Sequence, residues 1–188
     1  MNLRFADARD AAACLDIYAQ YIDTSITFET ALPSEAEFAA RIRSYGAVYP
    51  WLAAEEDGRL LAYAYAHRAQ ERAAYDWNAE LSVYVSRDAA RAGLGTRLYR
   101  ALLELLRQQG VRTAYGVVTM PNDASAALHR KLGFRQLGIY HNTGYKSGSW
   151  RDVVWFEKHI GSFEGVPEPV RPIGQIADRE AVLQIYSK

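Results

Sequence analysis

The chain has 188 residues, of which 49% are hydrophobic and 23% charged, and its 22 basic residues balance 22 acidic ones. This is the composition of an ordinary globular domain with some residues to spare, and it excludes wholesale disorder. A net charge of zero argues against a polybasic nucleic-acid-binding protein, but it leaves room for a small anionic ligand bound by a local patch.

Membrane and secretory classes are also disfavoured. No apolar run approaches the ~18 residues needed to cross a bilayer. The first residues, Met1 to Asp7, lack the apolar segment of a signal peptide. Cys14 is the single cysteine, which excludes a disulfide framework or a cysteine-rich zinc site within one chain. The sequence therefore predicts a cytoplasmic protein with no membrane partner.

The first part of the chain combines helical periodicity with strand signals. Ser34 and Glu37 form a capping box, which opens a helix, and Asp57-Gly58 is typical of a tight hairpin turn. The predicted elements are a strand at 3–5, a helix at 11–18, a helix after Ser34 that ends at Gly46, and hairpin strands at 51–55 and 60–67.

The middle of the chain alternates strands with helices. Period-two alternation over 79–85 predicts a strand, and an apolar stripe over 93–109 predicts a long amphipathic helix ended by Gly110. The remaining predicted elements are a strand at 113–119, a helix from 122 to 131, and hairpin strands at 136–145 and 151–158. This order indicates an α/β (α+β) domain built on one mixed sheet.

Residues 161–188 differ from the rest, because glycine and proline crowd together before a helical segment at 178–186. One interpretation is a linker followed by a C-terminal docking helix, outside a domain at 1–160. A second is the start of another copy of the domain, since 178–186 matches 10–18 at five of nine positions, as Asp, Ala, Leu, Ile and Tyr.

The segment Gly93-Leu94-Gly95 stands where a predicted strand turns into a helix. Glycine lets the backbone approach a ligand closely, and the first N–H groups of a helix attract anions, so this turn suits a pyrophosphate. It is not a dinucleotide-binding fingerprint, because Leu98 replaces the third glycine, and no Gly-Lys-Ser/Thr of a P-loop follows.

Several ordered motifs together resemble one known family. They are 75–85 (Tyr-Asp-Trp-Asn-Ala-Glu-Leu-Ser-Val-Tyr-Val), Gly93-Leu94-Gly95, 121–125 (Pro-Asn-Asp-Ala-Ser), 128–134 (Leu-His-Arg-Lys-Leu-Gly-Phe) and 144–153 (Gly-Tyr-Lys-Ser-Gly-Ser-Trp-Arg-Asp-Val). Over residues 3–158 the chain resembles the GCN5-related N-acetyltransferase (GNAT) superfamily, in its phosphinothricin and methionine-sulfone acetyltransferase branch.

This resemblance implies a mixed sheet of about seven strands with about four helices, and two strands that splay to admit acetyl-CoA. The pantetheine arm would pair with the backbone of Val83, Tyr84 and Val85, and Asn122 and Ser125 would reach it from the next helix. The residues expected to cradle the pyrophosphate are Arg91, Ala92, Gly93, Leu94, Gly95 and Thr96. The chain departs from the family pattern at Ala90, where Gln or Arg is usual, so the phosphate contact would be weaker or moved.

The resemblance also assigns catalytic roles. Glu80 would be the general base, directly or through water, with its pKa raised by desolvation, and a backbone N–H near Val83 or Tyr84 would meet the oxyanion. His129 would protonate the departing thiolate. The plainer alternatives are a solvated strand carboxylate for Glu80 and a surface or capping histidine for His129.

A small amino-acid substrate carries a carboxylate, for which Arg68 and Arg72 are the candidate partners. Phe28 and Tyr75 would form an aromatic wall, and Trp150 would do the same or support contact between two subunits of a homodimer. The other histidines, His67, His141 and His159, fit no motif and are expected on strand surfaces, and no metal-ligand spacing occurs.

The sequence thus predicts direct acetyl transfer from acetyl-CoA to a small amino-acid-like amine of the phosphinothricin, methionine sulfoximine or methionine sulfone type. Cys14 lies away from the motifs, which disfavours an acyl-cysteine route. Two alternatives remain open: an acetyltransferase for polyamines, aminoglycosides or protein N-termini, and an acyl-CoA-binding module without catalysis.

Overall fold

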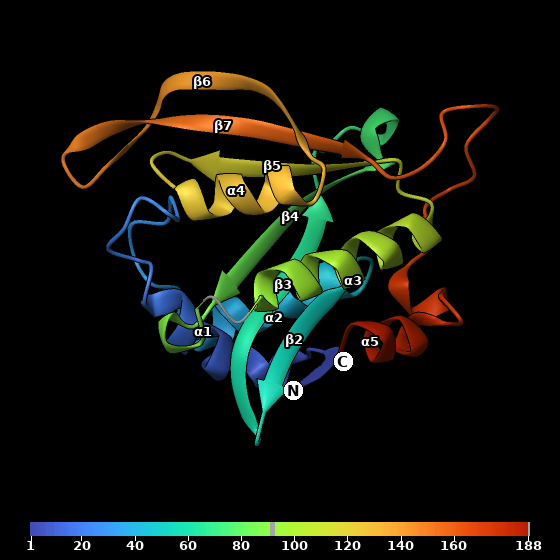
Figure 1. Cartoon of the computed structure of the whole chain (residues 1–188), viewed down its shortest axis with the longest axis horizontal. Coiled ribbons are helices and arrows are strands. Elements are labelled where there is room, and N and C mark those ends of the chain that lie inside the picture. The colour runs from blue at the N-terminus through green and yellow to red at the C-terminus, as the bar shows by residue number, and fades with distance from the viewer. Residues whose placement is uncertain (91–92, 188) are drawn as a thin grey trace.

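The computed structural model describes residues 1–90 and 93–187, and its architecture is one mixed sheet covered by helices on both faces (Figure 1). Within these ranges seven strands follow the order β1-β2-β3-β4-β5-β7-β6, with β4 and β5 parallel and all other neighbours antiparallel. The strands are β1 (Asn2–Phe5), β2 (Trp51–Glu56), β3 (Arg59–Arg68), β4 (Asn78–Val85), β5 (Thr113–Thr119), β6 (Arg135–Lys146) and β7 (Ser149–His159).

Two hydrophobic cores lie on opposite faces of this sheet. One face is covered by the first two helices, whose residues pack on Trp51, Tyr63 and Tyr65. The other face is covered by the later helices, which pack on small strand residues such as Ala62 and Ala114. The five α-helices of the described chain are α1 (Ala11–Ala19), α2 (Glu35–Gly46), α3 (Leu94–Gln109), α4 (Asp123–Lys131) and α5 (Arg179–Ser187).

Local signals in the sequence set many of these boundaries. Ser34 caps α2 in the predicted capping box with Glu37, and the Asp57-Gly58 turn joins β2 to β3. Gly93 and Gly110, which flank α3, both adopt left-handed backbone angles that favour glycine. The predicted mixed α/β sheet is therefore confirmed, and α5 is the C-terminal helix expected within 161–188.

β4 and β5 pair with each other over only part of their length. The parallel pairing runs from Asn78 opposite Thr113 to Leu81 opposite Gly116 and then ends. Beyond it, β4 continues to pair with β3 as far as Val85, while β5 continues to pair with β7 as far as Thr119. The two strands therefore diverge in the predicted way, and Figure 1 shows β4 leaving the line of β5.

The C-terminal segment folds back onto the domain. Trp77 Nε1 donates to the carbonyl of Glu168 at 2.8 Å, and the amide of Ile173 donates to Val48 at 2.9 Å. Helix α5 then packs on α3 and β1, where Leu183 is buried in the main core and Ser187 accepts a hydrogen bond from the Leu3 amide. In the part of the chain that the structure describes, no helix is long and apolar enough to cross a membrane.

Candidate active site

A cleft of about 600 Å³ lies where β4 and β5 diverge. The amide of Ser86 donates to Leu61 in β3, so by the two-residue alternation of a strand the backbone groups of Ser82 and Tyr84 face β3 as well. Those of Val83 and Val85 consequently face the cleft. The same reasoning applies to β5, where the Met120 amide donates to Asp152 beside β7, so Val117 and Thr119 face the cleft from the opposite side.

The N-terminus of α3 forms one end of this cleft. Gly93, Leu94, Gly95 and Thr96 all line it, and the first intrahelical bond that spans this turn runs from the Arg97 amide to the Gly93 carbonyl. The amides of the first turn are left without intrahelical partners and point toward the helix end, where the helix dipole favours an anion. Arg91 and Ala92, also expected here, lie outside the described residues.

Helix α4 provides the wall of the cleft beyond β5. Asn122 caps the helix, and its side-chain oxygen accepts a hydrogen bond from the Ser125 amide at 3.1 Å. The side-chain oxygen of Asn122 is thus engaged in the cap, which leaves its NH₂ group to donate. Asn122 and Ser125 both line the cleft, together with Leu128 and His129.

His129 lies across the cleft wall with its ring almost fully buried. It stacks on Phe156 at 5.1 Å between ring centroids and lies so close to β5 that a Cβ on Gly116 would overlap it. Its Nδ1 is 2.8 Å from the carbonyl of Ser125, so Nδ1 carries the hydrogen, and Nε2 is buried without a partner among the described residues. Burial lowers the pKa of His129, so the neutral ring with a free Nε2 lone pair is favoured.

Glu80 lies next to the point of divergence, on the face covered by α1 and α2. It precedes Leu81, the last paired residue of β4, and it stands opposite Tyr115 of β5 in the parallel register. Its side chain is 24% exposed, and Oε1 lies 3.8 Å from Nε2 of His67, its cross-strand partner in β3. Desolvation raises the pKa of Glu80, while the charge of His67 opposes the rise.

The four residues expected around the substrate lie in two places. Arg68, Arg72 and Tyr75 line a hollow of about 580 Å³ beside the loop between β3 and β4. There Arg68 forms an ion pair with Asp76, whereas Arg72 makes no ion pair within the described chain. Phe28 is not part of this hollow, since it lies in the loop between α1 and α2.

That loop is fastened to the hairpin of β6 and β7. Lys146 donates from Nζ to the carbonyl of Thr27 at 2.6 Å, and the Phe28 ring lies so close to Gly144 that a Cβ there would overlap it. The Thr27 hydroxyl also hydrogen-bonds to that of Tyr18 in α1. These contacts hold the loop over the sheet. Sequence reasoning missed the two contacts to the hairpin, at Lys146 and Gly144, because their partners are more than 110 residues apart.

The structure gives two further residues a setting that the sequence did not predict. His67 has Glu80 beside it rather than an unoccupied strand surface, because the register of β3 and β4 depends on the connection at 69–77. Cys14 is buried in the core under α1, and burial raises the pKa of its thiol to about 12. Among the described residues, no cluster of three side chains could hold a metal ion.

The diverging parallel strands and the helix N-terminus at one end of the cleft form the acyltransferase fold that the resemblance predicted. The family model described as the acetyltransferase (GNAT) domain matches residues 3–155. The chain belongs to this GNAT family and is an N-acetyltransferase.

Relatives and solved structures agree with this assignment. The chain is 39% identical over 177 residues to phosphinothricin N-acetyltransferase of Streptomyces viridochromogenes, which covers 94% of this chain and 96% of the relative. It is 32% identical to the L-methionine sulfoximine/L-methionine sulfone acetyltransferase of Pseudomonas paraeruginosa, over 88% of this chain and 98% of that one. A phosphinothricin acetyltransferase from Sinorhizobium meliloti, crystallised with acetyl-CoA, superposes with a TM-score of 0.84 at 34% identity, over 88% of this chain and 92% of that one.

Proposed function

We propose that the enzyme transfers the acetyl group of acetyl-CoA to the α-amine of a small amino acid of the phosphinothricin, methionine sulfoximine or methionine sulfone type. The observation that carries this proposal is the position of Glu80, a desolvated carboxylate one residue from the point where β4 and β5 part. A base at that point can reach an amine on one face of the sheet while the thioester enters from the cleft. The substrates named for the relatives support the choice of acceptor.

In this proposal acetyl-CoA lies in the cleft with its pyrophosphate at the N-terminus of α3 and its pantetheine amides against the cleft-facing backbone of β4 and β5, where the Val85 carbonyl also accepts a hydrogen bond from the Tyr21 hydroxyl. The amide of Val83 faces the cleft, whereas that of Tyr84 faces β3. We therefore assign the oxyanion contact to the Val83 N–H. A fixed backbone donor of this kind stabilises the charge that develops on the thioester oxygen without reorganising.

Glu80 removes a proton from the acceptor ammonium, which gives the neutral amine that attacks the thioester carbon. The C–N bond forms as the oxyanion develops, and its collapse breaks the C–S bond and releases the thiolate of coenzyme A. A second proton then passes from nitrogen to sulfur. We propose that His129 relays this proton, because its free Nε2 first accepts a proton and then donates it.

Transfer is direct within a ternary complex of enzyme, acetyl-CoA and amine. An acyl-enzyme route needs a thiolate in the cleft, but the single cysteine, Cys14, is buried in the core formed by α1 and α2 and does not line the cleft, and its raised pKa keeps it protonated. The kinetic signature of the ternary complex is a set of intersecting, not parallel, double-reciprocal plots.

Recognition of the acceptor is assigned to two groups of residues. Arg72, exposed beside the hollow at the β3–β4 loop, supplies a cation for the α-carboxylate, while Arg68 orients the loop through Asp76. Phe28 and Tyr75 provide apolar walls from two different loops. An arginine at this position favours an anionic acceptor over polyamines or aminoglycosides, whose cationic groups would be repelled.

The test is acetyl-CoA turnover by the full chain with a panel of free amino acids, polyamines, aminoglycosides and N-terminal peptides. We expect activity with small amino acids that carry an oxidised sulfur or phosphorus group, and a loss of about 10²-fold or more in kcat for Glu80→Gln with acetyl-CoA binding retained. Turnover with a cationic acceptor alone supports the first alternative. Binding of acetyl-CoA without turnover of any amine supports the non-catalytic module.

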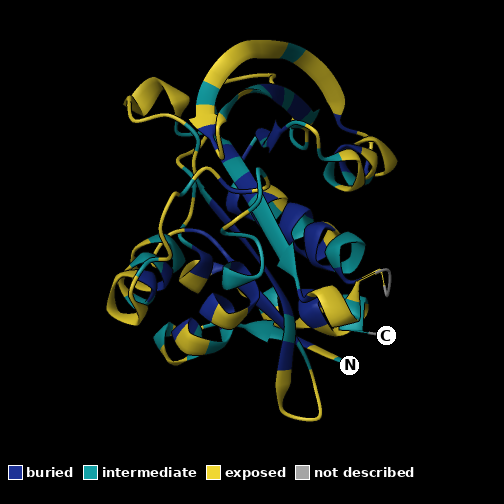
Figure 2. Cartoon of the chain, turned by 90° about the vertical axis from the view of Figure 1, so that its left-hand side faces the viewer, coloured by how far each residue is buried: buried dark blue, intermediate teal, exposed yellow. Residues whose placement is uncertain are grey.

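We further propose that the enzyme is a cytoplasmic homodimer. The hairpin of β6 and β7 supports the second copy, because β6 is largely exposed (Figure 2) and several of its exposed side chains are apolar. The large exposed hydrophobic side chains on the hairpin are Leu137, Ile139, Tyr140, Tyr145 and Trp150. Light scattering should give twice the chain mass of 21.1 kDa, and a monomer at all concentrations would contradict this proposal.

A further inference from the structure

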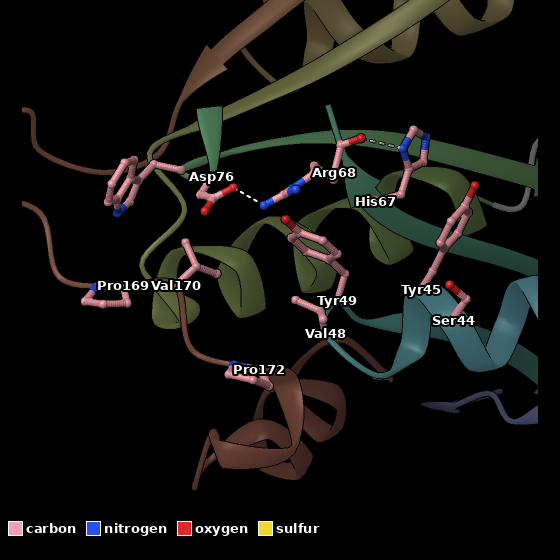
Figure 3. Close-up of a pocket in the computed structure, with 11 residues that line it drawn as sticks. Ser44, Tyr45, Val48, Tyr49, His67, Arg68, Asp76, Pro169, Val170 and Pro172 are labelled. Carbon is pink, nitrogen blue, oxygen red and sulfur yellow. Dashed lines mark hydrogen bonds and ion pairs between the residues drawn. The ribbon is translucent and has the colours of Figure 1, made fainter. Parts of the chain in front are cut away.

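A further cavity, called the second cavity below, lies on the side of His67 and shares no lining residue with the acetyl-CoA cleft. It has a volume of about 690 Å³ and opens between the end of α2, the end of β3 and the C-terminal segment (Figure 3). Tyr45 and Tyr49 line one side, Pro169 and Pro172 close the other, and His67 stands at one end. One side of the cavity is therefore formed by the C-terminal segment that follows the predicted domain at 1–160.

The ring of His67 is held in one orientation in this cavity. Its Nδ1 lies 2.9 Å from the carbonyl of Arg68, as the dashed line in Figure 3 shows. A carbonyl only accepts, so Nδ1 carries the hydrogen and Nε2 of the neutral ring presents its lone pair. Stacking on the Tyr45 ring, 5.2 Å away between centroids, fixes the plane of the imidazole. The lone pair belongs to the nitrogen that lies 3.8 Å from Glu80 Oε1.

The reaction releases one proton per turnover. An acceptor R–NH₃⁺ and acetyl-CoA give R–NH–CO–CH₃, coenzyme A thiol and H⁺, since one of the two protons lost by nitrogen goes to sulfur. The other proton passes to Glu80, which must lose it before the next turnover. In the proposed function the bound acceptor lies over Glu80, so a path to solvent that avoids the acceptor speeds this return.

We propose that His67 relays the proton from Glu80 to the solvent in this second cavity. The Glu80 carboxyl gives its proton to His67 Nε2, which restores the carboxylate. The imidazolium then releases the Nε2 proton to water in the cavity, while Nδ1 keeps its hydrogen bond to the Arg68 carbonyl. This inference rests on the proposed role of Glu80 as the base. The charged and titratable groups that face His67 from the surrounding elements are Tyr45 of α2, Tyr65 and Arg68 of β3, Glu80 of β4 and Asp76 of the β3–β4 loop.

The experiment compares kcat of the full chain and of His67→Gln over a range of pH and of imidazole buffer concentration. Gln keeps a polar side chain of similar size but carries no proton between states. We expect a ~10-fold fall in kcat at low buffer, because water replaces the relay only in part, with KM for acetyl-CoA unchanged and kcat restored as imidazole is added. In a plot of kcat against pH, the variant should also lack one of the two declines that the wild-type enzyme shows.

The matched control is His141→Gln. His141 also bonds through Nδ1 to a fixed acceptor, Asp152, but it lies on β6 at the far side of β5 and β7. It should show wild-type kcat at every imidazole concentration. His67→Asn serves as the second relay variant and should respond to imidazole as His67→Gln does.

Two outcomes separate the relay from the proposed function. If Glu80→Gln is inactive while both His67 variants match wild type at low buffer, or lose activity that imidazole does not restore, the relay is wrong and the role of Glu80 stands. If Glu80→Gln retains wild-type kcat, the proposed mechanism fails whatever the His67 variants do.

Discussion

Burial of Glu80 disfavours its ionised form. Ionisation of this carboxylate is therefore unfavourable for stability, although activity requires it. Because desolvation raises its pKa in the folded chain above the ordinary value of 4.5, the native state favours the protonated form. Ionisation therefore costs stability fully above the folded pKa and not at all below 4.5. Activity has the reverse requirement, since the base must be ionised.

We accordingly predict that Glu80→Gln raises the melting temperature at neutral and alkaline pH while it lowers kcat by about 10²-fold or more. The difference in melting temperature should shrink as the pH falls toward 4.5. In wild type, kcat/KM should fall on the acid side at a higher pH than an unperturbed glutamate would give. Thermal melts of both proteins from pH 4 to 9 test this, with Glu164→Gln on the exposed C-terminal segment as a control that moves neither quantity.

His129 presents the complementary case, a base that burial keeps neutral. Its folded pKa lies below the ordinary value of 6.5, so the stability that depends on the neutral ring is complete above pH 6.5 and is lost as the pH falls through the folded pKa. We predict that His129→Phe, which preserves the stack on Phe156, flattens this acid loss of stability. It should also lower kcat by ~10-fold or more.

Equal acid sensitivity of wild type and His129→Phe in melts between pH 4 and 8 would show that other groups control this loss. An unchanged kcat in the same variant would remove His129 from the proton path. His159→Phe, an exposed histidine on β7, is the matched control for adding a phenyl ring.

At the scale of helices and strands, the sequence predicted those boundaries that depend on neighbouring residues. The capping box at Ser34 and the glycines beside α3 act within a few residues, so they could be read directly. The proximity of His67 to Glu80 could not, because it depends on the register of two strands joined by an irregular connection. The second cavity was equally hidden, since Tyr45 and Pro169 come together only after the C-terminal segment has folded back.

The C-terminal helix yields a prediction at the same scale. We propose that residues 161–188 belong to the folding unit of the domain and are a docking segment rather than the start of a second copy. Leu183 of α5 is 2% exposed in the main core, so Leu183→Ala should cost about 2–5 kcal/mol of unfolding free energy. Denaturant unfolding measures this, and Ile185→Ala, on the exposed side of the same helix, should cost little.

If both variants unfold alike and with wild-type stability, α5 does not contribute to the core and the docking interpretation fails. A loss in Leu183→Ala that is accompanied by a single cooperative transition supports one folding unit, since a separately folded segment would unfold in a transition of its own.

At the scale of the whole molecule, the interrupted pairing of β4 and β5 divides one sheet into two half-sheets. In the described chain, the strand pairing that joins them runs over residues 78–81 and 113–116, next to the hydrogen bonds from Arg112 and Thr113 to the Trp77 carbonyl. Beyond that seam, the amides of Val83 and Val85 face those of Val117 and Thr119 across a gap in the hydrogen-bonding network. Any ligand that hydrogen-bonds to the exposed backbone of both strands joins the two half-sheets.

In the proposed binding mode, acetyl-CoA bridges the two half-sheets as an added strand, so its binding stabilises the folded chain. Amide hydrogen exchange should therefore slow at Val83 and Val85 when the cofactor binds, while exchange within the β2–β3 hairpin stays unchanged. Equal protection in both regions would mean a uniform tightening of the molecule. Slower exchange that is confined to Val83 and Val85 would show that the substrate itself stabilises the place where the sheet is interrupted, at the start of each turnover.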